Sequence, residues 1–200
     1  MPEETPAQET GAQQTGAQET GARLPTRPED LLARLDELGI AARTFTHPPV
    51  HTVAEAKARR GEIEGAHIKN LFLRNKKGAM WLVTCLEDRE IDLKALGRAL
   101  DAGRFSFGSA ARLMTYLGVE PGAVTPFGVI NDTEGKVRMV LDKALLDRGP
   151  INAHPLVNDM TVAVSPEGLL RFLEAAGHPP RILDFEALSD PGSDPGSNPG

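Results

Sequence analysis

Apolar residues of this chain recur at helical spacing in several segments. Leu31, Leu32, Leu35 and Leu38 fall on one face of a helix, which begins near Pro28 and ends at Gly39, two residues typical of helix boundaries. Side chains that cap helix N-termini open four further segments of this kind. These expected helices run from Thr52 to Arg60, from Asp92 to Leu100, from Ser109 to Gly118 and from Ser165 to Gly177.

Shorter apolar runs between turn residues predict strands. Two hairpins are expected, around turns at residues 75–78 and 133–135, because each turn ends in Gly between β-forming runs. Strands paired in hairpins, without a regular strand–helix–strand alternation, indicate one α+β domain with a mixed, largely antiparallel sheet flanked by helices. The expected strands are residues 42–46, 68–73, 80–86, 129–131, 136–141, 161–164 and 181–185.

The two ends of the chain are repetitive and poor in apolar residues. Residues 10–22 repeat Thr-Gly-Ala-Gln, and residues 189–200 repeat Ser-(Asp/Asn)-Pro-Gly. Such segments bury too little apolar surface to offset the entropy lost on ordering. We therefore expect residues 1–24 and 189–200 to be disordered and residues 25–188 to form the folded domain.

Charge is distributed unevenly between the ends and the folded part. The 200 residues carry a formal net charge of −6. Six of the acids lie in the repetitive ends, so the remaining 22 basic and 22 acidic residues balance. A neutral domain can still present a basic face to phosphates, although local clusters are more often plain solvated surface. The clusters are Lys57, Arg59 and Arg60, and then Lys69, Arg74, Lys76 and Lys77.

Several functional classes lack any signal in the sequence. There is no Gly-x-Ser-x-Gly elbow, phosphate-binding P-loop or dinucleotide fingerprint. No apolar run reaches about 18 residues, and no secretory signal opens the chain, so a cytoplasmic protein is expected. Cys85, the single cysteine, lies in an apolar run and is expected to be a buried, reduced thiol. His47 and His51 are separated by two prolines, which argues against a zinc site.

Three features remain as candidates for chemistry, and each has a simple structural alternative. Lys69 and Asn70 begin an apolar strand, where a lysine is an anion-binding group or an edge charge. The loop from Gly122 to Pro126 has amides open to a ligand, or it only connects two elements. His154 precedes a proline turn, where it is functional or merely structural.

Taken in order, these segments resemble the bacterial YbaK/ProX superfamily, homologues of the editing domain inserted in bacterial prolyl-tRNA synthetase. The resemblance extends over residues 28–186, and the alanyl-tRNA(Pro) deacylase branch, PrdX or ProX, is the nearest in motif. It implies a compact α+β fold around a mixed, curved sheet. The matching segments are Lys-Asn-Leu-Phe-Leu at 69–73, Pro-Gly-Ala-Val-Thr-Pro-Phe at 121–127, Asn-Asp at 131–132, Val-Leu-Asp at 140–142 and Asn-Ala-His-Pro-Leu at 152–156.

The resemblance also implies which residues form the functional site. Lys69 and His154 would be the functional residues in a broad sense, with Lys69 positioning a phosphate or ribose oxygen and His154 tied to alanine selectivity. Backbone amides between Gly122 and Gly128 would stabilise an oxyanion. No metal or cofactor is expected. The substrate-binding residues would be Asn70, Gly122, Thr125, Pro126, Phe127, Gly128 and Asn131.

The expected substrate is a mischarged tRNA, recognised at its aminoacylated 3′ end. A synthetase pocket built for proline rejects a smaller amino acid weakly, because missing methylenes cost only about 1–3 kcal/mol. A second site too small for proline would correct that error. Transient contact with prolyl-tRNA synthetase or an elongation factor is also expected. Two alternatives stay open: a deacylase for cysteinyl- or seryl-tRNA, and a non-catalytic nucleic-acid-binding module that uses the basic clusters.

Overall fold

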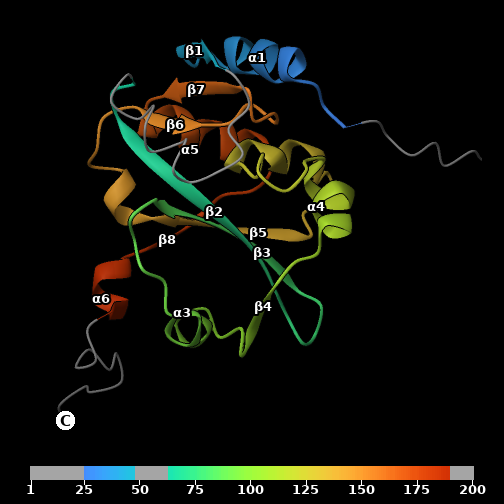
Figure 1. The fold of residues 1–200 in the computed structure, drawn as a ribbon, viewed down its shortest axis with the longest axis vertical. Coiled ribbons are helices and arrows are strands. Elements are labelled where there is room, and N and C mark those ends of the chain that lie inside the picture. The colour runs from blue at the N-terminus through green and yellow to red at the C-terminus, as the bar shows by residue number, and fades with distance from the viewer. Residues whose placement is uncertain (1–24, 48–62, 190–200) are drawn as a thin grey trace, which may run out of the picture.

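The computed structural model describes residues 25–47 and 63–189 (Figure 1). Most of the segments predicted to be disordered, residues 1–24 and 190–200, and the predicted helix at 52–60 lie outside these residues. Ser189, predicted to begin the disordered tail, is instead the last residue of a helix. None of the described helices is long and apolar enough to cross a membrane.

A single mixed sheet of eight strands forms the centre of the described part, with helices around it (Figure 1). The strand order is β1-β7-β6-β2-β3-β5-β8, and β4 also pairs with β2. Four strand pairs are antiparallel and three are parallel, which confirms the predicted α+β class. The strands are β1 Ala42–Thr46, β2 Ala66–Asn75, β3 Met80–Leu86, β4 Phe105–Phe107, β5 Val137–Asp142, β6 Ile151–Ala153, β7 Met160–Val164 and β8 Arg181–Leu183.

The long strand β2 organises the sheet. One edge pairs with β3 along residues 68–74, as the predicted first hairpin requires. The other edge pairs with β6 only at residues 66–67 and with β4 only at residues 73–75. Within the described chain, no strand therefore pairs with residues 68–72 on this second edge. A loop from elsewhere in the sequence can reach the strand there.

Helices form where the sequence predicts them, apart from the undescribed segment at 52–60. The side chain of Asp92 caps α3 by accepting from the Lys94 amide at 2.7 Å, and Ser109 and Ser165 cap α4 and α5 in the same manner. These caps satisfy amides that have no partner inside the helix. The helices are α1 Pro28–Glu37, α3 Leu93–Ala99, α4 Ala110–Leu117, α5 Pro166–Ala175 and α6 Phe185–Ser189, with short 3-10 turns η2 Pro126–Asn131 and η3 Lys143–Leu145.

Two hydrophobic clusters lie on the two faces of the sheet, because successive strand residues point to opposite sides. The larger cluster joins Phe72 and Leu82 of the sheet to α1, α4, η2 and α5. In the smaller cluster, the Trp81 and Phe105 rings pack edge-to-face, 5.0 Å between centroids, together with Leu96 of α3. These two cores fix which residues of β2 face each side.

The predicted second hairpin is wrong. Residues 129–131 belong to η2 rather than to a strand, because Pro126 and the Thr125 side chain start a helical turn there. The following strand, β5, pairs in parallel with β3 and β8 instead of folding back on residues 129–131. The last predicted strand also ends early, at Leu183, where α6 soon follows.

Replacing Phe127 by Ala should strongly destabilise the protein. This ring is fully buried and packs edge-to-face on Phe172, 5.1 Å between centroids. Removing such a side chain typically costs about 3–5 kcal/mol of unfolding free energy, measurable by urea denaturation. Met114→Ala on the exposed side of α4 is the control and should change the unfolding free energy by less than about 1 kcal/mol. Equal effects of the two substitutions would contradict this packing.

Candidate functional site

The side chain of Asn70 lies where the second edge of β2 has no strand partner. Its amide nitrogen donates to the Val124 carbonyl at 2.9 Å, and its amide oxygen accepts from the Thr84 hydroxyl at 2.6 Å. Thr84 is fully buried and sits opposite Asn70 in the β2–β3 register. Asn70 thus fixes the loop of residues 121–125 against the sheet.

The backbone of that loop allows a ligand to approach it closely at Gly122. Gly122 has a φ of +95°, a left-handed conformation that a residue with a Cβ rarely adopts. The Phe127 amide donates to the Thr125 side chain, and the Gly128 amide donates to the Thr125 carbonyl. These two amides are committed inside the turn, which argues against their predicted part as oxyanion donors. Within the described chain, the amides of Gly122 and Val124 form no such bond and remain for a ligand, whereas Thr125 is fully buried.

The loop after β6 brings His154 to the same region. A Cβ built on Gly122 would lie 3.9 Å from the Asn158 side-chain amide, so the glycine loop borders this second loop. Nδ1 of the His154 ring lies 2.9 Å from the Met160 carbonyl. Because a carbonyl only accepts, Nδ1 carries the proton, and Nε2 of the neutral ring is left as an acceptor. Asn158 is a candidate that the sequence analysis missed.

His47 lies close to His154 because the strands that precede the two histidines both pair with β7. The two ring centroids are 6.4 Å apart, and His47 Nε2 lies 3.0 Å from the Thr161 hydroxyl. β1 pairs with β7, and β7 pairs with β6, which places the ends of these strands side by side. The two histidines are 107 residues apart in the sequence, and only the order of the strands in the sheet brings them together. The sequence therefore contains no local signal for this pair.

The environment of His154 favours its uncharged form. Burial lowers the pKa of the imidazole below 6.5, the bond to the Met160 carbonyl opposes this, and the neighbouring His47 lowers the pKa further. At neutral pH the ring is therefore an uncharged hydrogen-bonding group rather than a cation.

Lys69 points away from Asn70, to the other face of β2. Its ammonium group donates to the Arg89 carbonyl. Arg89 is in turn held by Asp142, whose side chain is 1% exposed, at 3.2 Å, and by Glu186 at 3.3 Å. The Arg89–Asp142 pair thus positions the carbonyl that holds Lys69. Neither residue stands out in the sequence as a site residue.

Three of the predicted substrate-binding residues have structural roles in this fold. The Asn131 side chain accepts from the Thr26 amide and donates to the Leu117 carbonyl, both at 2.9 Å, so it joins the start of the domain to α4. Phe127 is a fully buried core residue. Gly128 permits close contact with α4, because a Cβ there would lie 3.1 Å from that of Leu117.

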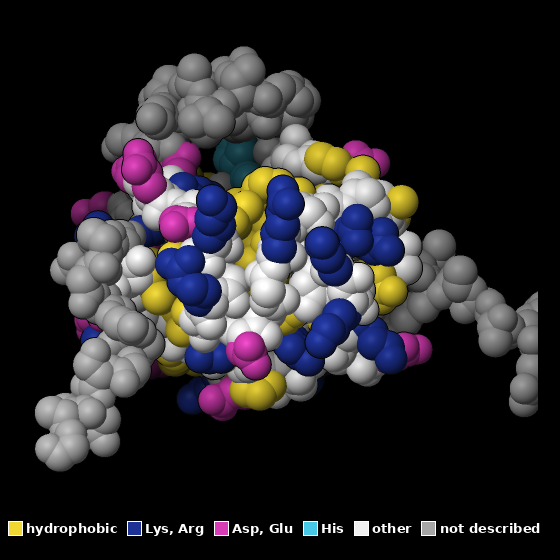
Figure 2. Space-filling view, turned by 90° about the horizontal axis from the view of Figure 1, so that it is seen from below, with side chains coloured by type: hydrophobic (Ala, Val, Ile, Leu, Met, Phe, Trp, Pro, Cys, Tyr) yellow, Lys and Arg dark blue, Asp and Glu magenta, His cyan; other side chains and the backbone are white. Residues whose placement is uncertain are grey.

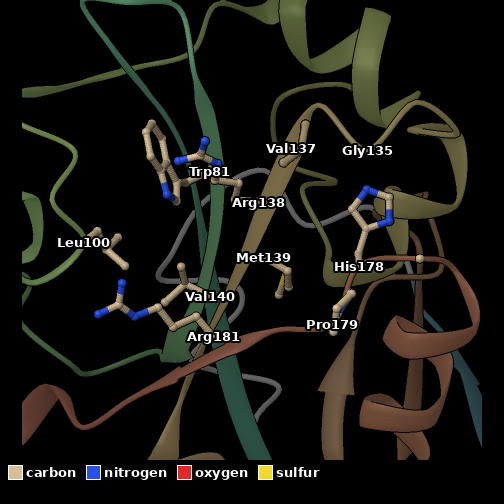
Figure 3. A pocket seen from close by; sticks show the side chains of 11 residues that line it. Trp81, Leu100, Gly135, Val137, Arg138, Met139, Val140, His178, Pro179 and Arg181 are labelled. Atoms are coloured by element: carbon tan, nitrogen blue, oxygen red, sulfur yellow. The ribbon is translucent and has the colours of Figure 1, made fainter.

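Two hollows of the described surface lie away from these residues. A cavity of about 290 Å³ lies beside β5, between Trp81, Arg138, Arg181 and the segment before β8 (Figure 3). Another, of about 780 Å³, is bordered by His67, Arg89, Arg148 and Glu186. Neither is lined by Lys69, Asn70, residues 121–126 or His154. The candidate site is therefore defined by the contacts of Asn70, Gly122 and His154 rather than by a cavity of the described residues.

Cys85 is a poor nucleophile in this structure. It is fully buried, and burial raises the pKa of its thiol to about 11, which the nearby Lys69 only partly offsets. The thiol is therefore protonated at neutral pH. Among the described residues, no group of three His, Cys, Asp or Glu side chains could hold a metal ion.

Comparison with known proteins identifies relatives of this chain. The sequence model of the "Aminoacyl-tRNA editing domain" family matches residues 47–172. "Prolyl-tRNA synthetase associated domain-containing protein 1" of Mus musculus is 40% identical over 78% of this chain and 95% of its own. "Prolyl-tRNA editing protein ProX" of Acetoanaerobium sticklandii is 40% identical over 74% of this chain and 91% of its own.

Solved structures share the fold at low sequence identity. A crystal structure described as a candidate trans-editing enzyme for prolyl tRNA synthetase superposes with a TM-score of 0.61 at 20% identity. The match covers 78% of this chain and 94% of that one. These comparisons confirm the resemblance inferred from the motifs.

The Asn70–Thr84 bond can be tested by a double-mutant cycle. Asn70→Ala leaves the buried Thr84 hydroxyl and the Val124 carbonyl without this partner and should cost about 1–3 kcal/mol of unfolding free energy. Thr84→Val removes the hydroxyl, so the double variant should be more stable than the sum of the single losses predicts. Strict additivity in urea denaturation would contradict direct coupling of these side chains.

The His154 ring should titrate below its ordinary pKa. An NMR titration of the imidazole should give a midpoint below 6.5, because burial favours the neutral ring. The unfolded chain then binds more protons than the native one as the pH falls below 6.5, so this group's contribution to stability is lost at acid pH. The His154→Gln variant should show a weaker loss of stability between pH 6.5 and 5. A midpoint at or above 6.5 would contradict this account.

Proposed function

The chain belongs to the aminoacyl-tRNA editing domain family, and from this we propose that it hydrolyses the ester of mischarged Ala-tRNA(Pro) as a free-standing enzyme. A relative named for prolyl-tRNA editing, which aligns over 91% of its own length, supports this function. The geometry that supports it best is the joining of Asn70, the Gly122 loop and the His154 loop at the open edge of β2.

The reaction needs few chemical groups. Water attacks the ester carbonyl, and the negative charge that develops on the oxygen must be stabilised. The amides of Gly122 and Val124 are the donors proposed for this oxyanion, and each well-aligned donor contributes about 3 kcal/mol. Because the loop is fixed by Asn70, these donors are oriented before the substrate binds.

We assign His154 and Lys69 to substrate binding rather than to proton transfer. The neutral His154 ring offers Nε2 as an acceptor for the substrate's ammonium group or for a water molecule. Lys69 is the positively charged donor proposed for a phosphate or ribose oxygen of the terminal nucleotide. Because its side chain lies on the face of β2 opposite Asn70, the nucleotide would have to extend past the open edge of the strand to reach it. The Arg89–Asp142 pair supports Lys69 and belongs to the same proposal.

Selectivity for alanine would follow from size. The His154 loop and the Gly122 loop border one another, so a wider amino acid such as proline has less room between them than alanine. Discrimination against the larger substrate at this second site complements the weak rejection of alanine by the synthetase. The proposed partners are tRNA(Pro) and, transiently, prolyl-tRNA synthetase or an elongation factor, and the proposed location is the cytoplasm.

A deacylation assay tests this function. The purified protein should release alanine from Ala-tRNA(Pro) much faster than the spontaneous rate and leave Pro-tRNA(Pro) intact. Lys69→Ala and His154→Ala should each lower kcat/KM by about 100-fold, the loss expected when a positioned group is removed. Lys136→Ala, an exposed lysine on the turn before β5, is the matched control and should retain full activity.

Other substrates separate the alternatives. Faster hydrolysis of Cys- or Ser-tRNA than of Ala-tRNA(Pro) would replace the alanine assignment while keeping the deacylase. Binding of tRNA without hydrolysis of any ester would instead favour the non-catalytic module.

A further inference from the structure

Exposed basic side chains gather on one end of the molecule, away from α1 and β1. Figure 2 views the end formed by α3, β4 and the β2–β3 turn, where Lys and Arg side chains extend across the face. We call this surface the basic face. It comprises Lys76 and Lys77 of the β2–β3 turn, Lys94 and Arg98 of α3, Arg138 of β5 and Arg181 of β8, all exposed.

The cations of the basic face are not locked into ion pairs. None of its six residues forms an ion pair with a described residue, whereas Arg27, Arg34, Lys136 and Lys143 elsewhere on the surface each do. Asp92 lies nearby, and its carboxylate caps α3 and also attracts Lys94 and Arg98, so it offsets part of the positive charge. The folded domain is close to neutral overall, so a cluster of six cations makes this end more positive than the domain as a whole.

Two of the arginines are held in place by the fold. The Arg138 guanidinium lies 5.1 Å from the centre of the Trp81 ring, and Arg181 donates to the Ala99 carbonyl at 2.8 Å. Between them lies the 290 Å³ hollow beside β5 (Figure 3). Because these side chains are already ordered, binding an anion there loses less side-chain entropy than binding through free arginines.

We propose that the basic face binds the sugar–phosphate backbone of the tRNA substrate, away from its aminoacylated end. This inference rests on the proposed function and assigns the surface that holds the rest of the RNA. Trp81 and Leu100 under the face are only 2% and 8% exposed, and among the described residues of this end the large exposed apolar side chains are Phe107 of β4 and Ile182 of β8. The six exposed cations therefore outnumber the exposed apolar groups, unlike the apolar centre of a typical protein–protein interface. Spaced, unpaired cations around a hollow fit a phosphate backbone.

Two charge-reversal variants test the face: Lys76→Glu with Lys77→Glu, and Lys94→Glu with Arg98→Glu. Binding of uncharged tRNA is measured by fluorescence anisotropy between 50 and 200 mM salt. Each pair should weaken binding at least about tenfold, and the slope of log K against log salt should become shallower by about 2, which corresponds to two lost phosphate contacts. Arg34→Glu with Arg43→Glu, on α1 and β1 at the other end, is the matched control and should bind like the unaltered protein.

Neutral substitutions guard against misfolding. Lys94→Gln with Arg98→Gln should weaken binding in the same direction, with an unfolding midpoint within a few degrees of the original. Deacylation adds an independent readout: the reversals should raise KM for full-length Ala-tRNA(Pro), leave kcat unchanged, and have little effect on alanyl-adenosine, which lacks the RNA body.

The outcomes separate this inference from the proposed function. If the reversal variants bind tRNA as tightly as the unaltered protein, the proposal that the basic face binds tRNA is overturned, even if deacylation is confirmed. Undetectable tRNA binding by the unaltered protein at 50 mM salt would overturn it as well. A third outcome is that the protein hydrolyses no charged tRNA, while both reversal variants lose tRNA binding and the control variant keeps it. This outcome would support tRNA binding by the basic face and refute the proposed deacylase activity.

Discussion

A single side chain, Asn70, joins the sheet to the loop on which the candidate site depends. It bonds to a carbonyl of that loop on one side and to a buried hydroxyl of β3 on the other. An amide is suited to this position because it both donates and accepts, so neither partner is left unsatisfied in the interior. The gap between β6 and β4 on the edge of β2 leaves this amide free to reach the loop.

The sheet also separates two kinds of function. On one face of β2, Asn70 orients a loop whose backbone amides are neutral groups. On the other, Lys69 lies within a charged network in which Asp142 and Glu186 hold Arg89. Adjacent residues of a strand can serve both sides because their side chains alternate. The Lys69–Asn70 dipeptide therefore links two environments across the thickness of the sheet.

Local sequence signals predicted the elements that depend on neighbouring residues. Helices capped by Asp92, Ser109 and Ser165 and the first hairpin were predicted correctly, since a cap or a tight turn is specified within a few residues. The second hairpin failed, because β5 takes partners that are distant in the sequence. For the site, motif resemblance selected Lys69, Asn70, Gly122 and His154, whereas His47, Asn158 and the Arg89–Asp142 support needed the fold. Motif order also could not separate core residues such as Phe127 from groups open to a ligand.

The parallel arrangement of β3, β5 and β8 has a consequence for synthesis of the protein. β1, near the start of the domain, pairs with β7, near its end. The central strand β3 pairs with β5, whose other edge pairs with β8, the last strand. A nascent chain on the ribosome therefore cannot complete this sheet until its last strand has emerged. Products of premature termination would expose unpaired strand edges, and the cell would meet them as substrates for chaperones and proteases rather than as partly working enzymes.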